Sequence, residues 1–557
     1  MKKACSGGQL KFTPGRKPPN RRWIQAKLSR TLNDKDGSSP STVRRGSYRS
    51  GFAFGVVSFL VNGVVGAVTT LLISRIYGVK VVGEFALISA PVLMLGLVST
   101  VKEQAALVKE ITGLAPRHPR VTELFSAVFT FSFGLTVLLA IPTMLITSIL
   151  FRGPLHHPAL VAPALVNIAG YTLINNNSSN FDTIFSTFVA GRQLFVVRLY
   201  EVLSVMVITT GLGLAWHSIW GLVFGTLGGS LIALAHRIIV VRPYVRLRLT
   251  RSEARAGLRA LPGLLRFGIR ITPGGIAQGL STQVGIWTLA GFRYPLSTIG
   301  AYSRAQSIPE RMQGVNQVTS QVLYPTLVGR RHAGDGEGFD RALIDSIRYA
   351  LIGTLLVAAV FGGAAHSLLA IFGPGFSRGA PALALLILAP VLAAIWYAQD
   401  MALLAAGRPG LTSIMALARL GLTIVLTVAL TPTLGITGPA IALLAGALLQ
   451  VCWGWIATRE LLSEPLRVTW PLRERFAPIA AYACGFGAAL AVEHAMPTTA
   501  GLLLSLTAGT LVYLAAIILG GGVNGRDRRR LAESAERLKA WRKRRSPPKT
   551  PIGLPGG

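Results

Sequence analysis

Two arginines, Arg304 and Arg311, lie seven residues apart in a stretch with few other charges. In a helix this spacing places both side chains on one face, two turns apart. Arginine offers a forked set of donors that matches phosphate oxygens, so this face is suited to hold a pyrophosphate. Arg270, at the mouth of the preceding apolar stretch, is placed to receive such a group first. The alternative is that Glu310 or another acid neutralises the arginines and that they only hold helices together.

Three acids, Asp182, Glu201 and Asp400, lie inside other apolar stretches. An ionised side chain at the bilayer centre costs about 2.5 to 3.5 kcal/mol on insertion scales, so it needs a function or a partner. The three acids are therefore candidates for ion or proton coupling. Asp400 and Arg419 flank a turn at similar distances, which favours a structural salt bridge, and Asp182 and Arg198 flank an earlier turn in the same way.

Amide side chains form a further polar set. Its members are Asn62, Asn177, Gln278 and Gln283, with Asn177 inside a run of asparagines and serines. Such a polar face is typical of a hydrated cavity wall that can bond sugar hydroxyls. Hydrogen bonds between helices, worth about 0.6 to 2 kcal/mol each, explain the same residues equally well.

Motifs for enzymatic catalysis are missing from the sequence. There is no nucleophile elbow, Walker sequence or HExxH at a credible site. The three cysteines have no CxxC spacing, and His156-His157 has no further metal ligands nearby in the sequence. We therefore expect neither an enzyme, nor a metal site, nor a cofactor.

The composition is typical of an integral membrane protein. Of 557 residues, 51% are hydrophobic and 14% are charged, and the mean hydropathy is +0.52. Several stretches, such as 52–74 and 420–458, contain no Asp, Glu, Lys or Arg and exceed the roughly 20 residues that cross a bilayer. We predict an all-α polytopic membrane protein with about fourteen spanning helices. The expected helices are 52–74, 84–101, 122–149, 159–189, 194–214, 218–240, 269–291, 299–328, 346–372, 379–406, 410–431, 435–458, 476–493 and 498–521.

Basic residues gather in alternate loops and in both tails. Cytoplasmic loops retain positive charge, so this alternation places both termini in the cytoplasm of a bacterial inner membrane. The formal charge of +34 therefore reflects topology rather than nucleic-acid binding. The tails are also expected to attract anionic membrane lipids.

Three pairs of short motifs recur at similar separations, which indicates an internal repeat. They are Gly83-Glu84-Phe85 with Gly300-Ala301-Tyr302, Ala190-Gly191-Arg192 with Ala406-Gly407-Arg408, and Asp182 with Asp400, at separations of 217 (300 − 83), 216 (406 − 190) and 218 (400 − 182) residues. We expect two pseudo-symmetric six-helix lobes, plus two C-terminal helices, with the transport pathway between the lobes. The predicted divisions are a basic, disordered cytoplasmic tail (1–50), an N-lobe (51–241), a basic cytoplasmic connector (242–268), a C-lobe (269–458), helices 13 and 14 (459–523) and a second basic cytoplasmic tail (524–557).

The order of several short motifs resembles a known family, the Wzx-type oligosaccharide (polysaccharide biosynthesis) flippases of the multidrug/oligosaccharidyl-lipid/polysaccharide exporter superfamily. The motifs are Gly51-Phe52-Ala53-Phe54-Gly55, Arg75-Ile76-Tyr77-Gly78, Gly83-Glu84-Phe85, Phe267-Gly268, Gly300-Ala301-Tyr302, and Leu323-Tyr324-Pro325 ahead of Arg330-Arg331. The resemblance covers roughly residues 50–520. It implies two lobes that alternately expose a cationic central cavity to each side, with a polyprenyl-pyrophosphate-linked sugar as cargo.

The expected function is therefore transport of a lipid-linked oligosaccharide from the cytoplasmic to the outer leaflet for envelope or exopolysaccharide assembly. A glycan polymerase and glycosyltransferases are possible partners. The alternatives are a lipid II flippase, a drug/cation antiporter of the same superfamily, and a non-transporting membrane subunit of a glycan-assembly system. An antiporter would have an acidic rather than a cationic cavity, as the resemblance implies.

Overall fold

The computed structural model describes most of the apolar part of the chain. The described residues are 48–99, 107–108, 110–111, 114–188, 190–246, 259, 261–262, 265, 269, 272–463, 470–496, 499–522 and 536. Arg270, most of the predicted connector and nearly all of the two predicted tails lie outside them.

We call the helices before the connector the N-half. They are α2 (Tyr48–Val98), α4 (Pro119–Arg152), η1 (Pro158–Leu160), α5 (Val161–Gly170), η2 (Tyr171–Asn175), α6 (Asn176–Thr187), α7 (Gly191–Ala215) and α8 (Ile219–Val241). α2 contains two helical parts that meet at Gly78, whose backbone has φ 74° and ψ 170°. A positive φ suits glycine, so the predicted break between the first two helices is confirmed.

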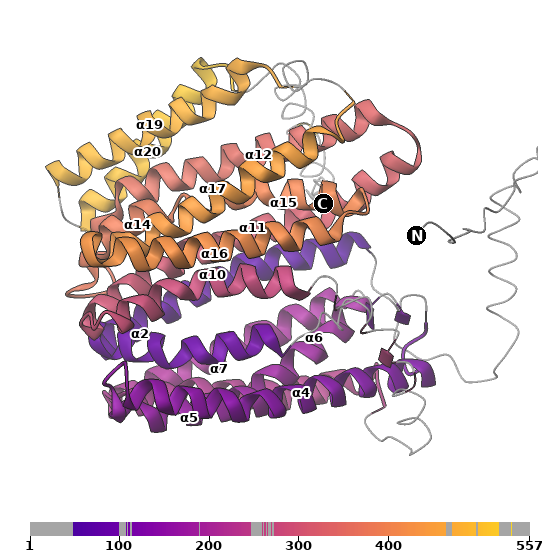
Figure 1. Cartoon of the computed structure of the whole chain (residues 1–557), viewed down its shortest axis with the longest axis vertical. Helices are drawn as coiled ribbons and strands as arrows, with labels where there is room; N and C mark the ends of the chain where they lie inside the picture. Colours follow the sequence, from indigo (N-terminus) through magenta and orange to yellow (C-terminus); the bar gives the residue numbers. More distant parts are fainter. Residues whose placement is uncertain are drawn as a thin grey trace, which may run out of the picture. The chain divides into compact units, whose positions relative to one another are not determined.

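We call the helices after the connector the C-half, followed by a final pair. The C-half contains α10 (Thr272–Gly291), α11 (Leu296–His332), α12 (Gly336–Gly363), α13 (Ala365–Ala370), η3 (Phe376–Gly379), α14 (Ala380–Leu386), α15 (Ala389–Ala405), α16 (Pro409–Leu434) and α17 (Thr437–Arg459). The final pair is α19 (Leu472–Ala495) and α20 (Thr499–Leu519), and these two helices pack on each other and on α12 (Figure 1).

Apolar length accounts for most of these helices. Within the described residues, eleven stretches are long and apolar enough to cross a membrane, and the one that contains α2 includes both sides of its kink. α10 and α11 are not among the eleven. Both pack against α2 and other C-half helices. Because these neighbours surround them, α10 and α11 need less apolar surface than a helix that faces lipid. Together these helices account for the fourteen predicted crossings.

Most helix ends follow the predictions, but the helix predicted at 346–372 differs at both ends, since α12 ends at Gly363 and α13 follows as a separate helix. α12 begins at Gly336, whereas hydropathy placed its start at residue 346. The additional helical turns at the start of α12 carry Glu337, Asp340 and Arg341, so hydropathy does not predict them as part of a membrane-spanning helix. Asp335 caps this extension, because its Oδ1 accepts a hydrogen bond from the amide of Gly338 at 2.8 Å.

The two halves meet where α2 crosses α11. A Cβ added at Gly83 would collide with the carbonyl oxygen of Leu296, and one added at Gly300 would collide with that of Val79. Each added Cβ would also lie 2.9 Å from the amide nitrogen of the other glycine. The contact is reciprocal, as a local two-fold relation requires, and the two glycines hold equivalent places in the predicted repeat.

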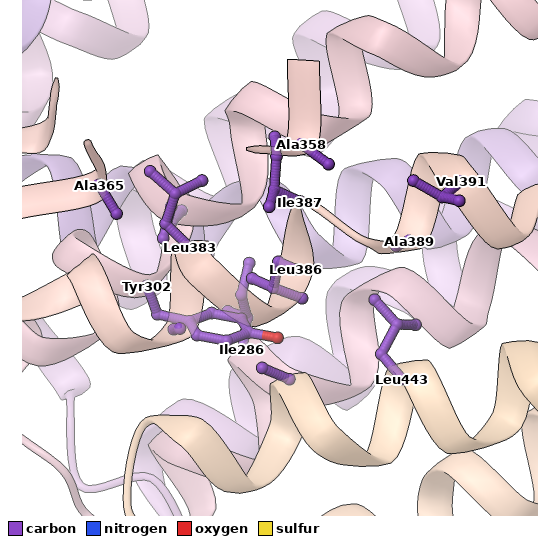
Figure 2. Packing of buried hydrophobic residues seen from close by; sticks show 14 of the residues in the cluster. Ile286, Tyr302, Ala358, Ala365, Leu383, Leu386, Ile387, Ala389, Val391 and Leu443 are labelled. Atoms are coloured by element: carbon purple, nitrogen blue, oxygen red, sulfur yellow. The ribbon is translucent and has the colours of Figure 1, made fainter. Parts of the chain in front are cut away.

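A continuous apolar core runs through the C-half and into the N-half. Figure 2 shows part of it, where Ile286 of α10 and Tyr302 of α11 lie beside the short helix α14 and near Leu443 of α17. The Tyr302 ring passes over Gly285, whose added Cβ would lie 2.5 Å from the phenol oxygen. This packing fixes the axial rotation of α11 and thereby the direction of its charged side chains.

Candidate functional site: a polar interior divided by helix α11

Helix α11 carries its polar side chains on two opposite faces. Arg304 and Arg311, seven residues apart, share one face. Gln306, Glu310 and Gln313, at i, i+4 and i+7, share the other. The first face meets α2 of the N-half, and the second lines a cavity inside the C-half. α11 therefore separates a basic region from an acidic one.

The basic face reaches across to α2. Arg311 Nη2 donates a hydrogen bond to Thr70 Oγ1, and Gly66 leaves room for the guanidinium, since an added Cβ there would lie 2.6 Å from Arg311 Nη1. Arg304 lies two helical turns before Arg311 on this face, and the charge of Arg311 acts on it. Arg304 Nε is buried and has no hydrogen-bond partner among the described residues. Glu310 also acts electrostatically on Arg311, although it points to the opposite face.

The acidic face lines a cavity of about 550 Å³ between α10, α11, α15, α16 and α17. We call it the C-half cavity. Glu310, Asp400 and Arg419 are its charged residues. Amide and aromatic side chains complete much of the wall: Gln278, Gln313, Gln450, Trp396 and Tyr397. Glu310 Oε1 accepts a hydrogen bond of 2.7 Å from Gln306 Nε2.

Asp400 and Arg419 share the C-half cavity but take different partners. Arg419, 4% exposed, donates from Nη1 to Gln450 Oε1 at 3.1 Å. Asp400 lines the cavity with Thr412, whose hydroxyl donates to Pro409 O at 2.9 Å. Among the contacts of the described residues there is no ion pair between the two. Both residues line one cavity, but the salt bridge expected from the sequence is not formed, and the amide oxygen of Gln450 on the adjacent helix α17 accepts a hydrogen bond from Arg419 instead.

The acids of the N-half lie in a closed ion cluster. Asp182 Oδ1 pairs with Arg237 Nε at 3.0 Å, and its Oδ2 pairs with Arg198 Nε at 3.3 Å. Glu201 Oε2 lies 2.6 Å from Arg237 Nη2. Arg237, at the centre, is only 2% exposed. We call these four residues the N-half cluster.

The sequence analysis missed Arg237. A signal was present, because Arg237 is the single Asp, Glu, Lys or Arg between residues 219 and 241. A charge in a membrane helix needs a partner, and Asp182 and Glu201 were already candidates on neighbouring helices. The pairing of Asp182 with Arg198 across the turn agrees with their placement from the sequence.

The predicted amides fall in separate places. Gln278 lines the C-half cavity, whereas Gln283, one turn further along α10, is buried and donates to Thr282 Oγ1 at 3.3 Å. Asn177 is buried in α6 and donates to Leu173 O at 2.8 Å, beside the π-helical turn η2. Asn62 is half-buried on α2. Only Gln278 is thus assembled with the acids. No group of three or more potential metal ligands occurs among the described residues.

The fold and the charged interior define a multi-pass membrane protein of transporter architecture, and solved structures share this architecture. The chain is similar to the lipid II flippase MurJ in an inward closed conformation, with 14% identity and a TM-score of 0.64 over 84% of this chain and 98% of that one. It is similar to a Pyrococcus furiosus transporter of the MOP superfamily, with 16% identity and a TM-score of 0.53 over 77% and 99% of the two chains. An inward-facing multidrug resistance MATE transporter of the same superfamily gives 15% identity and a TM-score of 0.51 over 72% and 94%.

The family model for polysaccharide biosynthesis proteins matches residues 49–329, which is just over half of the chain. The chain belongs to this polysaccharide biosynthesis protein family. No curated protein matches the sequence significantly.

Proposed function

We propose that this protein flips a polyprenyl-pyrophosphate-linked oligosaccharide across the bacterial cytoplasmic membrane by alternating access. The observation that carries the proposal is the pair Arg304 and Arg311 on the face of α11 that meets α2. Two guanidinium groups on one helix face in a membrane interior repel each other, and unpaired charges there are costly. A pyrophosphate offsets both costs, because it accepts forked hydrogen bonds and carries the opposite charge.

The position of the arginines also fits a transport pathway. They lie on the helix through which the two halves meet, so a movement of the halves changes their surroundings. The buried, unpartnered Nε of Arg304 is a donor free to bind an anion. The lipid tail of such a substrate would stay in the bilayer while the sugar and pyrophosphate pass between the halves.

We assign ion coupling to the C-half cavity rather than to the N-half cluster. Asp400 and Glu310 face a volume large enough for water and a cation, and Arg419 is held by Gln450. Asp182 and Glu201 are already neutralised by Arg237 and Arg198. Of the three acids predicted from the sequence, Asp400 is therefore the best candidate.

Topology and partners follow from the same proposal. The basic loops and tails place both termini in the cytoplasm, with anionic lipids as their neighbours. Substrate moves from the cytoplasmic to the outer leaflet, where a glycan polymerase would use it. Glycosyltransferases on the cytoplasmic side would supply it.

A flipping assay in vesicles tests the proposal. The Arg304→Gln, Arg311→Gln double variant should lower the flipping rate of a fluorescent polyprenyl-pyrophosphate sugar by about 100-fold, because charged hydrogen bonds contribute about 1.5 to 3 kcal/mol each. Arg341→Gln is the matched control, since Arg341 is half-exposed and, in the described part of the chain, its ion pair is with Glu337 of the same helix α12. An unchanged rate in the double variant would overturn the proposed site.

A second candidate is flipping of lipid II, favoured by the fold similarity to a lipid II flippase. Lipid II is also a polyprenyl-pyrophosphate sugar, so the arginine pair suits both. Parallel assays with lipid II and with an oligosaccharide carrier separate the two. A drug/cation antiporter would instead exchange a cationic dye, and a non-transporting assembly subunit would move none of these substrates.

A further inference from the structure

A second cavity, of about 360 Å³, lies among turns that follow odd-numbered predicted helices. Because both termini are expected in the cytoplasm, the turns after odd-numbered helices are the predicted outward turns. Three turns form it: the kink of α2 after Gly78, the turn 153–157 after α4, and the turn between α10 and α11. Two of these turns belong to the N-half and one to the C-half. A group bound here would therefore touch both halves.

The lining is basic. Four of its nine residues are Lys80, His156, His157 and Arg293, and none of the nine is acidic. We call this cavity the basic pocket. Glu84, one turn along α2, interacts electrostatically with Lys80 but does not line the pocket. Outward turns of this chain carry few basic residues, so their convergence on one cavity is unexpected from topology alone.

The backbone holds two of these residues in an unusual conformation. His156 has φ 55° and Arg293 has φ 59°, and only one other non-glycine residue of the described chain, Arg117, has a positive φ. Such conformations cost about 1 to 3 kcal/mol and persist where surrounding structure enforces them, often at functional sites. Here they bring Arg293 Nη2 within 3.4 Å of His156 Nε2.

The contact between Arg293 and His156 uses only part of the hydrogen-bonding capacity of Arg293. His156 Nδ1 lies 3.0 Å from Pro154 O, so the neutral ring donates there and leaves Nε2 as an acceptor for the arginine. The remaining donors of Arg293 and the ammonium of Lys80 are exposed at the pocket. An anion can take these donors without breaking the fold.

We propose that the basic pocket binds a phosphate group carried on a lipid head. Arginine binds phosphate through two parallel donors and lysine binds it as a point charge, while Leu155 and Leu296 supply an apolar wall beside them. The volume lies within the common range for small-ligand pockets of about 300 to 1,000 Å³. Only the identity of the lipid rests on the proposed transport function, since a phospholipid head offers the same chemistry.

Binding to the full chain in detergent tests this inference without any transport step. The probes are polyprenyl pyrophosphate, phosphatidylglycerol and inorganic pyrophosphate, each titrated against wild type and the Lys80→Gln, Arg293→Gln double variant. The double variant should bind at least one of the two lipids about tenfold or more weakly, which corresponds to about 1.4 kcal/mol. Arg378→Gln is the control, because Arg378 is an exposed arginine in another predicted outward turn that does not line the pocket.

The probes also identify the source of the phosphate. A loss confined to polyprenyl pyrophosphate assigns the pocket to the transported lipid, and a loss confined to phosphatidylglycerol assigns it to a bulk phospholipid. Equal affinity of wild type and the double variant for all three probes would overturn the inference. So would an equal loss in Arg378→Gln, or a loss for inorganic pyrophosphate alone. Because flipping is not measured, a failure here leaves the Arg304 and Arg311 proposal standing.

The pH dependence gives a further readout. Burial and the neighbouring charge of His156 lower the pKa of His157, so the ring is uncharged near neutral pH. Acidification through the pKa of His157 adds a positive charge to the pocket that also contains Lys80, Arg293, His156 and the phenol of Tyr294, with Glu84 beside Lys80. Binding of phosphatidylglycerol, whose phosphodiester stays charged, should tighten by about threefold to tenfold once His157 is protonated, and His157→Gln should remove part of this gain. Binding that weakens on acidification would contradict a role for the histidines.

Discussion

The N-half cluster and the C-half cavity contain the same kinds of charged groups in opposite states. In the N-half, two carboxylates and two guanidinium groups pair directly around Arg237. In the C-half, the carboxylates of Glu310 and Asp400 face a cavity, and the one guanidinium group among them binds an amide. In the first region each acid is ion-paired with an arginine, whereas in the second neither acid has an ion pair among the described residues.

This difference is the basis for assigning ion coupling to the C-half in the proposed function. A buried network in which each acid has an arginine partner is costly to break, so its acids are expected to keep their charge during a transport cycle. Acids that face a hydrated cavity can exchange ions or protons at small cost. We therefore expect variants in the two hairpins, which look alike in the sequence, to fail in different ways.

The largest effect is expected from Arg237→Leu. This change leaves Asp182 with its half-exposed partner Arg198 alone and Glu201 with no ion-pair partner among the described residues. Breaking a buried charge pair by removing one member costs about 3 to 5 kcal/mol. The purified protein in detergent should unfold at a clearly lower temperature, and its yield should fall.

Arg198→Gln is the matched control, because Arg198 pairs with the same Asp182 but its side chain is 49% exposed. Exposed pairs contribute about 0 to 1 kcal/mol, so its unfolding temperature should barely move. If both variants unfolded at the same temperature as wild type, the N-half cluster would not be structural.

Hydropathy and charge predicted most of the fold. All of the expected helices recur, since an apolar run of about 20 residues has few alternatives in a membrane. The start of α12 was missed because an amphipathic extension beyond the apolar run carries charges. The turn at Gly78 was placed correctly because glycine marks a backbone that other residues avoid.

The sequence predicted several residues of the candidate site but not which of them contact one another. The spacing of Arg304 and Arg311 gave their common face, because helical periodicity is a local property. Sequence distance gives no information on which face of α15 meets which face of α16, so Arg419 was assigned to Asp400 instead of Gln450. Arg237 was missed for the same reason, since its partners are 55 and 36 residues away.

A smaller effect on stability is expected at the crossing of α2 and α11, where the N-half contacts the C-half. Gly83→Ala places a methyl group against the backbone of α11, and overpacking costs about 1 to 3 kcal/mol. Gly300→Ala should give a similar loss, because the contact is reciprocal. Gly63→Ala on the same helix α2 is the control, since an added Cβ there meets nothing within 4 Å. Thermal unfolding of the three variants measures this, and a loss in Gly63→Ala as large as in Gly83→Ala would refute the crossing.

The C-half acids should affect transport rather than folding. Glu310→Gln with Asp400→Asn keeps the shapes and removes the charges that face the C-half cavity. Flipping in vesicles should slow by about tenfold and lose its response to an imposed proton or sodium gradient, while the unfolding temperature changes little. Asp182→Asn should lower the unfolding temperature and leave the gradient response intact, because Asp182 is part of the N-half cluster. A gradient response that survives in the C-half variant but disappears in Asp182→Asn would reverse the assignment.

The smallest effect on stability, and the sharpest test of the comparison, is expected from Gln450→Leu. Gln450 Oε1 accepts the hydrogen bond from Arg419 Nη1, so its removal frees the guanidinium within the cavity that also contains Asp400. A new ion pair there would make the C-half resemble the N-half, and the net change in stability should stay within about 1 kcal/mol, because one hydrogen bond is exchanged for another. Gradient-driven flipping should fall because Asp400 is then neutralised by protein. Arg419→Gln combined with Gln450→Leu should restore part of the response, and a combined variant no faster than Gln450→Leu would show that Arg419 does not restrain Asp400.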